Sequence, residues 1–156
     1  MKVLSPTAAL FALSLGACGD RSAIVDPSPD VAGTWSLART VLSAEGCDLL
    51  LEPIPTPVEI VIREIDPGDI EIDVPVVAEV SMTLAGSVGS DGDFEVRDSH
   101  EESGLVSESF LVEGTFAGEV FTGIENSEIR FFAPELIELT GTERCRVVIR
   151  WEGERV

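Results

Sequence analysis

Tyrosine is absent from this 156-residue sequence, and histidine and lysine occur once each, as His100 and Lys2. Acidic residues number 29 against 10 basic ones, so a nucleic-acid-binding surface, which needs clustered lysine and arginine, is not expected. Serine hydrolysis would have to use His100 as its base, and no Gly-x-Ser-x-Gly sequence presents a nucleophile. Histidine-rich zinc, phosphate-loop and dinucleotide-binding patterns are missing too. The sequence predicts neither an enzyme nor a cofactor.

Aromatic residues make up only 6% of the chain, and we expect Phe94, Phe110 and Phe116 to lie in the core of strands. The composition leaves room for a hydrolase with two catalytic carboxylates. A sugar site of that kind usually stacks its substrate on aromatic rings, which are scarce here. Without Lys2 the chain carries 9 arginines and 29 acidic residues, a net charge of −20. Such a surface is repelled by anionic headgroups and stays dispersed in water.

Long hydrophobic runs are also missing, and the clearest short one is Ala8–Leu15, which follows the positive charge of Lys2. A charged start followed by a short apolar segment is typical of a secretory signal. Eight residues cannot span a hydrocarbon core of roughly 30 Å. We therefore interpret residues 1–17 as a signal peptide rather than a membrane-spanning helix.

The apolar run ends in Leu15-Gly16-Ala17-Cys18, which resembles the lipobox of bacterial lipoproteins. The resemblance implies cleavage before Cys18, attachment of diacylglycerol to its sulfur, and residence in the cell envelope. Because Gly19 rather than an acidic residue follows the cysteine, it also implies the outer membrane rather than the inner one. Residues 18–30, with Pro27 and Pro29, are predicted to be a tether, and residues 31–156 a single domain.

Period-two alternation of apolar and polar residues recurs through residues 31–156, as in Ile70, Ile72 and Val74, with Gly, Pro and Asp between the runs. Turns are expected at 66–69 and 89–93. Strands are expected near 34–42, 58–63, 70–74, 80–85, 93–97, 105–113, 115–122, 127–132, 135–140 and 144–151. The pattern predicts an all-β domain: an antiparallel meander of about 8–10 strands in a closed or nearly closed barrel, with a two-sheet sandwich as the alternative.

Cys47 and Cys145 are the two cysteines left in the exported domain, and we expect them to form a disulfide. Cys47 follows the first expected strand and Cys145 begins the last. If these strands pair antiparallel, the bridge fastens the seam of the barrel. The register expected from this reasoning places Val41 opposite Cys145, Leu37 opposite Ile149, and Trp35 opposite Trp151.

Gly33-Thr34-Trp35 opens the first expected strand, and an arginine lies near the end of the last. This pattern resembles the calycin or lipocalin-like barrels. The resemblance implies that Trp35 plugs one end of the barrel and that Arg150, or less readily Arg155, packs across the ring. Trp35 as an ordinary core residue is the other interpretation. A helix beside the last strand belongs to that family's pattern, and we expect none here.

Arg39 shares the register of Trp35 and Leu37, so its guanidinium is expected on the apolar face. A buried, unpaired guanidinium is very costly. Arg39 must therefore be paired, lie at a rim, or contact an anionic ligand such as a fatty-acid carboxylate. Arg39 and Trp35 are the candidate ligand-binding residues.

The other polar clusters have ordinary interpretations as well as functional ones. His100, beside Asp98, Glu101 and Glu102, is a metal ligand, a pH sensor or part of a solvated loop, and we expect the loop and no metal. Three oxygen-bearing residues across a turn offer calcium ligands or simple turn chemistry: Asp91, Asp93 and Glu95. Three arginines of the last strand are expected to pair with Glu135 and Glu138 or to face an acidic partner: Arg144, Arg146 and Arg150.

Two functions remain open. The first is a membrane-anchored envelope lipoprotein whose β-domain is structural or binds a macromolecule. The second is a lipocalin-like binder of a small apolar or amphipathic molecule, which an interior cavity would favour. The sequence favours the first because it requires fewer specialised residues.

Overall fold

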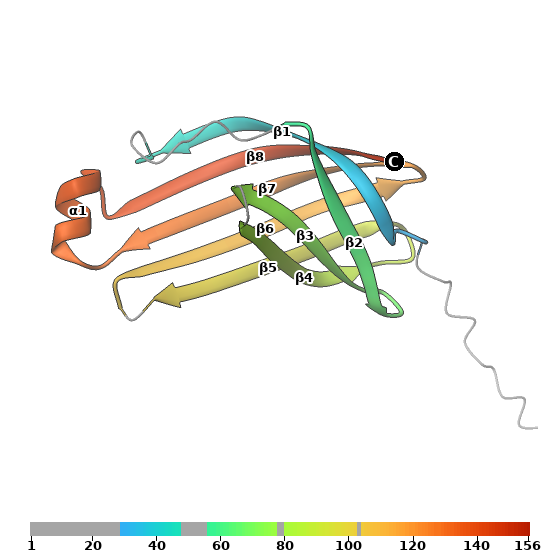
Figure 1. The fold of residues 1–156 in the computed structure, drawn as a ribbon, viewed down its shortest axis with the longest axis horizontal. Coiled ribbons are helices and arrows are strands. Elements are labelled where there is room, and N and C mark those ends of the chain that lie inside the picture. The colour runs from blue at the N-terminus through green and yellow to red at the C-terminus, as the bar shows by residue number, and fades with distance from the viewer. Residues whose placement is uncertain (1–28, 48–55, 78–79, 103) are drawn as a thin grey trace, which may run out of the picture.

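A computed structural model describes residues 29–47, 56–77, 80–102 and 104–156. Cys18, the expected signal peptide 1–17 and most of the expected tether 18–30 lie outside this part. Eight antiparallel strands, each hydrogen-bonded to the next and the last to the first, form a closed barrel (Figure 1). The strands are β1 (Gly33–Glu45), β2 (Val58–Asp66), β3 (Asp69–Val77), β4 (Val80–Val88), β5 (Asp93–Glu102), β6 (Val106–Ala117), β7 (Val120–Phe131) and β8 (Arg144–Arg155). The predicted all-β meander is confirmed, as a barrel rather than a sandwich.

The segment between β7 and β8 differs from the prediction, because residues 135–140 form a helix, α1 (Pro134–Thr140), and not a strand. Pro134 occupies the first turn and Gly141 ends the helix at a φ of 71°. Proline at the start and left-handed glycine just past the end are helix boundary signals. The expectation of no helix beside the last strand was therefore wrong.

The strands β6 and β7 are each longer than expected. Residues 115–122 do not form a strand of their own, because the chain reverses at Gly118, whose φ is +66°. The register of the two strands runs without a break from Val106↔Phe131 to Ala117↔Val120. The three strands expected over 105–132 are therefore two long ones.

The pairing of β1 with β8 is antiparallel, as predicted, but the register was wrong by four residues. Trp35 lies opposite Arg155, Leu37 opposite Gly153, and Val41 opposite Ile149. The prediction ended the first strand at 42 and placed the cysteine bridge beyond it. In the structure β1 continues through a bulge after Val41 to Glu45, so that Cys47 reaches Cys145 almost directly across the ladder.

One end of the barrel, here called the closed end, is filled by apolar side chains. Its centre is a cluster of rings: Trp35, Phe94, Phe116 and Phe121, with ring centroids 4.8–5.9 Å apart. Gly153 leaves room for the ring of Phe121, since a Cβ built on it would lie 1.9 Å from Cε1 of that ring. Phe94 and Phe116 are buried as predicted, whereas Phe110 is only partly buried.

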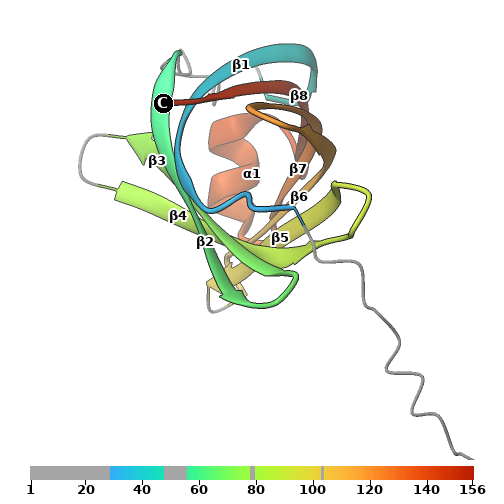
Figure 2. The same ribbon diagram turned by 90° about the vertical axis from the view of Figure 1, so that its right-hand side faces the viewer.

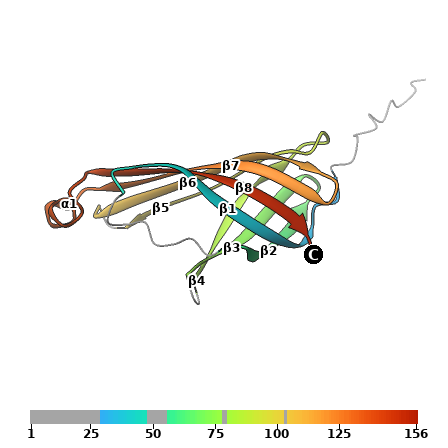
Figure 3. The same ribbon diagram turned by 90° about the horizontal axis from the view of Figure 1, so that it is seen from above.

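The other end, here called the distal end, is an open sheet. The register of β1 with β2 stops at Leu37, and that of β4 with β5 stops at Arg97. Beyond these points β5, β6, β7, β8 and the rest of β1 continue toward α1 without covering strands (Figures 1 and 3). Figure 2, which looks along the barrel, shows α1 behind the ring of strands. A small second core lies there: Cys47, Phe131 and Cys145, against which Leu136 and Ile137 of α1 pack.

Candidate binding site at the barrel mouth

Trp35 lies in the closed end with no exposed surface. Its Nε1 donates a hydrogen bond to the carbonyl oxygen of Val31 at 3.0 Å. The guanidinium carbon of Arg155 lies 5.2 Å from the ring centroid, and Arg150 is exposed on the outer side. Trp35 therefore packs as core, and the arginine across it is Arg155, the less favoured of the two residues that the resemblance offered.

Arg39 lies where β2 begins and β3 ends, and it is half-buried. Its Nη2 donates to the carbonyl oxygen of Pro75 at 3.4 Å, and its backbone N–H donates to Thr56 Oγ1 at 3.1 Å. Its Nε is buried and has no hydrogen-bond partner among the residues that the structure describes. Burial lowers the pKa of Arg39, and the negative charge of Glu125 acts in the opposite direction. The predicted alternatives of pairing and of a rim position are thus both partly realised.

Glu125 is the residue that the sequence did not reveal. Its side chain is 4% exposed and lies inside the barrel, where it accepts a 2.7 Å hydrogen bond from Trp151 Nε1 and another from Ser127 Oγ. Arg39 and Glu125 attract each other but form no direct ion pair. Glu125 continues the inward alternation of Phe121 and Gly123 on β7. Because the expected strands left residues 123–126 unassigned, this alternation was interrupted in the prediction.

Partly buried apolar side chains border these two charges. Val58, Met82, Phe110 and Val147 pack on the edge of the core, and Val41, paired with the inward-facing Ile149, is 42% exposed. We call the region formed by Arg39, Glu125 and these apolar residues the mouth of the barrel. It combines an apolar wall with one buried carboxylate and one guanidinium nitrogen without an acceptor. Ligand sites commonly have this composition.

His100 is exposed to solvent as expected, but it lies on β5 opposite Glu108, so the expectation of a loop there was wrong. Within the described residues no group of three or more His, Cys, Asp and Glu side chains could hold a metal ion. At the β4–β5 turn, Asp91 Oδ1 accepts from the backbone N–H of Asp93, and Asp93 Oδ1 accepts from Thr115 Oγ1 at 2.6 Å. The Asp91 oxygen serves the turn itself, and the Asp93 oxygen joins β5 to β6, so both have ordinary structural roles.

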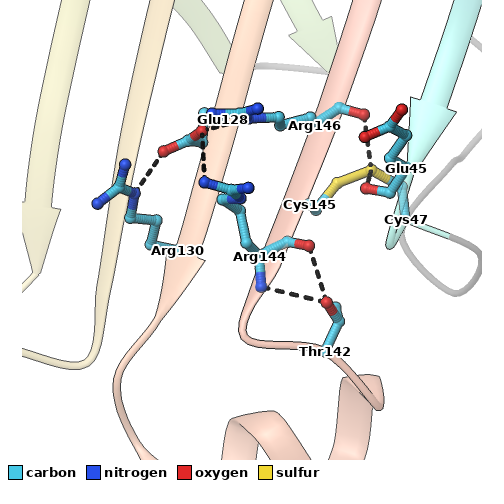
Figure 4. Close-up of polar contacts among 8 residues, drawn as sticks. All are labelled: Glu45, Cys47, Glu128, Arg130, Thr142, Arg144, Cys145 and Arg146. Carbon is cyan, nitrogen blue, oxygen red and sulfur yellow. Dashed lines mark hydrogen bonds and ion pairs between the residues drawn. A yellow bond between two sulfur atoms is a disulfide. The ribbon is translucent and has the colours of Figure 1, made fainter.

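The arginines of β8 do not meet the predicted partners. Glu135 and Glu138 lie on α1, whereas Arg144 and Arg146 pair with Glu128 of β7, together with Arg130 (Figure 4). Glu128 and Arg146 lie directly opposite each other in the ladder. The expected pairing was wrong because it assumed a strand over 135–140, which would have placed both glutamates beside β8.

Comparison with protein-family models, with curated proteins and with solved structures found no match for this chain. The class is therefore defined by the fold: a closed eight-stranded antiparallel meander barrel, plugged at one end by tryptophan and phenylalanine rings. This architecture is consistent with the lipocalin-like fold that Gly33-Thr34-Trp35 implies. The helix before β8 agrees with the same pattern.

Proposed function

We propose that this chain is an envelope lipoprotein, exported and anchored through diacylglycerol on Cys18, whose barrel binds a partner and does not catalyse a reaction. The lipobox and the short apolar segment before it support the export and the anchor. The Cys47–Cys145 disulfide supports an oxidising compartment. Within the described residues no helix has the length and apolarity needed to cross a membrane.

The direction of the barrel gives this proposal a geometry. β1 begins at the end opposite α1 (Figure 1). A chain tethered through residues 18–30 therefore enters the domain at the closed end. The mouth and α1 then lie on the side away from the anchoring membrane, where they are accessible to a partner.

The mouth supports a small amphipathic ligand as the partner, and the buried Arg39 Nε without an acceptor carries this assignment. An acceptor atom of a ligand would complete the hydrogen bonding of Arg39. The apolar chain of such a ligand would cover Phe110, Val147 and the exposed side of Val41. Buried polar groups in proteins are nearly always satisfied. Within the described residues two buried side-chain nitrogens lack a hydrogen-bond partner, the Nε atoms of Arg155 in the closed end and of Arg39, and we assign the second to a group supplied from outside because partly buried apolar side chains lie on the edge of the core there.

The headgroup that fits is a neutral or zwitterionic acceptor. Arg39 Nε lacks an acceptor among the described residues, and the negative charge of Glu125 acts on Arg39 from within the barrel. An amide, an alcohol or a zwitterion supplies the acceptor without adding net negative charge, whereas a carboxylate would be repelled by Glu125. We therefore expect a primary fatty amide to bind more tightly than the fatty acid of the same chain length.

A macromolecular partner is the second candidate, supported by three apolar side chains exposed near the tip of the distal end. Leu105, Phe132 and Leu139 are 44%, 50% and 72% exposed. Leu105 and Phe132 are joined by a backbone hydrogen bond of 2.9 Å, and Leu139 lies on α1. Exposed apolar groups gathered in one region mark interaction surfaces.

The ligand proposal is tested by native mass spectrometry of the exported chain, purified without denaturation. We expect a reproducible adduct that weakens in Arg39→Gln and in Glu125→Gln and persists in Arg150→Gln, which alters an exposed arginine outside the barrel. An adduct that is equally abundant in all variants, or no adduct even with added fatty amide, would refute the mouth as the site. Pull-down by the wild type but not by Phe132→Ser/Leu139→Ser would then support the second candidate.

The anchor is tested separately by growing cells with labelled palmitate. We expect the label on the wild-type chain and its loss in Cys18→Ser. The matched control is Cys47→Ser, which removes a cysteine of the disulfide and leaves the lipobox intact. Label retained in Cys18→Ser would overturn the proposed anchor without touching the ligand proposal.

A further inference from the structure

Carboxylates outnumber arginines on this chain, but the ratio is reversed in the ion pairs around Glu128, on the outer face of the distal end. Arg63 of β2 forms ion pairs with two carboxylates, those of Glu71 and Asp73. Around Glu128, in contrast, one carboxylate meets three arginines: Arg130, Arg144 and Arg146 (Figure 4). We call these four residues the arginine cluster. A single carboxylate cannot neutralise three guanidinium groups, so the cluster carries an excess of positive charge on a domain of opposite net charge.

The contacts within the cluster leave hydrogen-bond donors free. Arg130 and Arg146 both reach Glu128 through Nε, the latter at 2.6 Å. Arg144 approaches the same carboxylate with Nη1 at 3.8 Å. The Nη atoms of Arg130 and Arg146 donate no hydrogen bond within the described part of the chain. These three arginine side chains are 47–53% exposed, whereas that of Glu128 is 18% exposed. Glu128 thus holds the guanidinium groups in place and leaves their outer nitrogens directed at solvent.

A hollow of about 520 Å³ adjoins the cluster on the same face, with Glu128 and Arg146 in its lining. Its other polar residues are Ser43, Ser109, Asn126, Ser127 and Glu45. The hydroxyls of Ser43 and Ser109 and the amide of Asn126 are neutral donors for further oxygens of a ligand, whereas the hydroxyl of Ser127 donates to Glu125. Glu45 is the one lining group besides Glu128 that opposes an anion. The hollow is wide enough for a small polar molecule and too open to bind it by apolar burial.

We propose that the arginine cluster and this hollow form a binding site for the phosphate group of a small phosphate monoester. The planar forks of arginine match the oxygens of phosphate, and hydrogen bonds between charged groups are the stronger kind. A phosphate has three terminal oxygens and two negative charges, so it can use donors that one carboxylate leaves idle. A nucleic acid does not fit, because its many charges meet the acidic remainder of the domain, while a small anion feels chiefly the charges within a Debye length of about 8 Å.

The test is an NMR titration of the full exported chain with inorganic phosphate and then glycerol 3-phosphate, following the Nε–Hε signals of arginine at low ionic strength. We expect saturable shifts at Arg130 and Arg146 with a dissociation constant on the order of 1 mM. Arg130→Gln/Arg146→Gln should weaken binding by about tenfold or more, because two charged donors are lost. Arg97→Gln, the matched control, removes an exposed arginine that is paired with Glu95 on β5 and should change binding by less than about twofold.

Glu128→Gln separates a binding site from a structural ion-pair cluster. In the proposed site Glu128 and the phosphate compete for the same arginines. Removing the charge of Glu128 should therefore tighten phosphate binding by about threefold. Shifts that never saturate, or an equal effect of Arg97→Gln, would overturn the proposal as general charge screening. Binding to vesicles of phosphatidylglycerol without binding of free phosphate or glycerol 3-phosphate would also overturn it, in favour of a membrane surface.

Discussion

The two ends of this barrel are stabilised by different means, although β5, β6, β7, β8 and β1 run through both. At the closed end all eight strands surround a core of interlocked rings, with Trp35 and Trp151 without exposed surface. At the distal end five strands form an open sheet whose inner face is covered in part by α1. There a disulfide joins residues 98 positions apart, and ion pairs cluster on the outer face.

Strand length explains the contrast. The shorter β2, β3 and β4 have nine residues each, whereas β1, β6, β7 and β8 have twelve or thirteen. The longer strands therefore extend beyond the shorter ones and expose an inner face that a complete barrel would bury. An open sheet face must be stabilised by other contacts, here the disulfide and the ion pairs. It is also where a ligand can enter. Regions with few apolar contacts open more readily, and binding sites are often found in them.

Breaking the closed end should have the largest effect. Trp35→Ala removes a fully buried indole that makes edge contacts with Phe116 and Phe121, and it should lower the free energy of unfolding by about 3–5 kcal/mol. Urea denaturation followed by far-UV circular dichroism measures this loss. Trp35→Phe keeps a ring and should lose less. A loss below about 1 kcal/mol in Trp35→Ala would mean that the closed end is not the main core.

Removing the disulfide of the distal end should lower the free energy of unfolding somewhat less than Trp35→Ala, and its effect should be local. Cys47→Ala/Cys145→Ala is expected to lower the free energy of unfolding by about 2–5 kcal/mol, because the unfolded chain regains its loop entropy. Hydrogen exchange should accelerate first in residues 41–45 of β1, the start of β8 and α1. Equal acceleration at Trp35 and at Cys145 would contradict the division of the molecule into two ends.

The tightness of packing at the closed end can be tested by a substitution that adds a single methyl group. Gly153→Ala places a Cβ 1.9 Å from the ring of Phe121, and it should cost about 1–3 kcal/mol through overpacking. The matched control is Gly89→Ala, where the new Cβ lies close only to the flexible side chain of Asp91 and in ordinary contact, at 3.6 Å, with the carbonyl oxygen of Asp93. It should cost about 0.5 kcal/mol or less. Thermal unfolding of the two variants compares them directly. Equal melting temperatures would show that the core around Phe121 can relax.

The features that depend on the alternation of apolar and polar residues could be predicted from the sequence. Period two identifies most of the strands, and two cysteines within the predicted domain leave one simple pairing. Register was harder to obtain, since it depends on where a strand ends and on bulges such as the one after Val41, which leave no clear sign in the sequence. A single bulge or a longer strand end moves every pair beyond it.

The candidate site was only half predictable, for the same reason. Arg39 could be placed on the inner face by its spacing from Trp35. Glu125 could not, because it lies inside a stretch with small neighbours, Gly123 and Ser127, that carries little apolar alternation. Its partner Trp151 is 26 positions away in sequence and lies opposite Gly123 in the ladder, diagonally across from Glu125. Contacts of that kind depend on the register between β7 and β8, which are separated by α1, and no local pattern contains that register.

The smallest expected effect concerns the ion pairs of the distal end and their dependence on pH. Hydrogen bonds from Arg146 and Arg130 hold the pKa of Glu128 below its ordinary value. A carboxyl group with a depressed pKa in the folded state stabilises the protein above its unfolded pKa, and this contribution disappears as the pH falls through the folded value.

Glu128→Gln should therefore lower stability at pH 7 by less than about 1 kcal/mol, as exposed ion pairs usually do. The difference from wild type should vanish in strong acid. Melting temperatures from pH 7 down to pH 2 measure it, with Glu138→Gln on the exposed side of α1 as the control. A difference that persists undiminished at the acid limit would mean that Glu128 acts through packing, and that the distal end is stabilised less by charge than its contacts indicate.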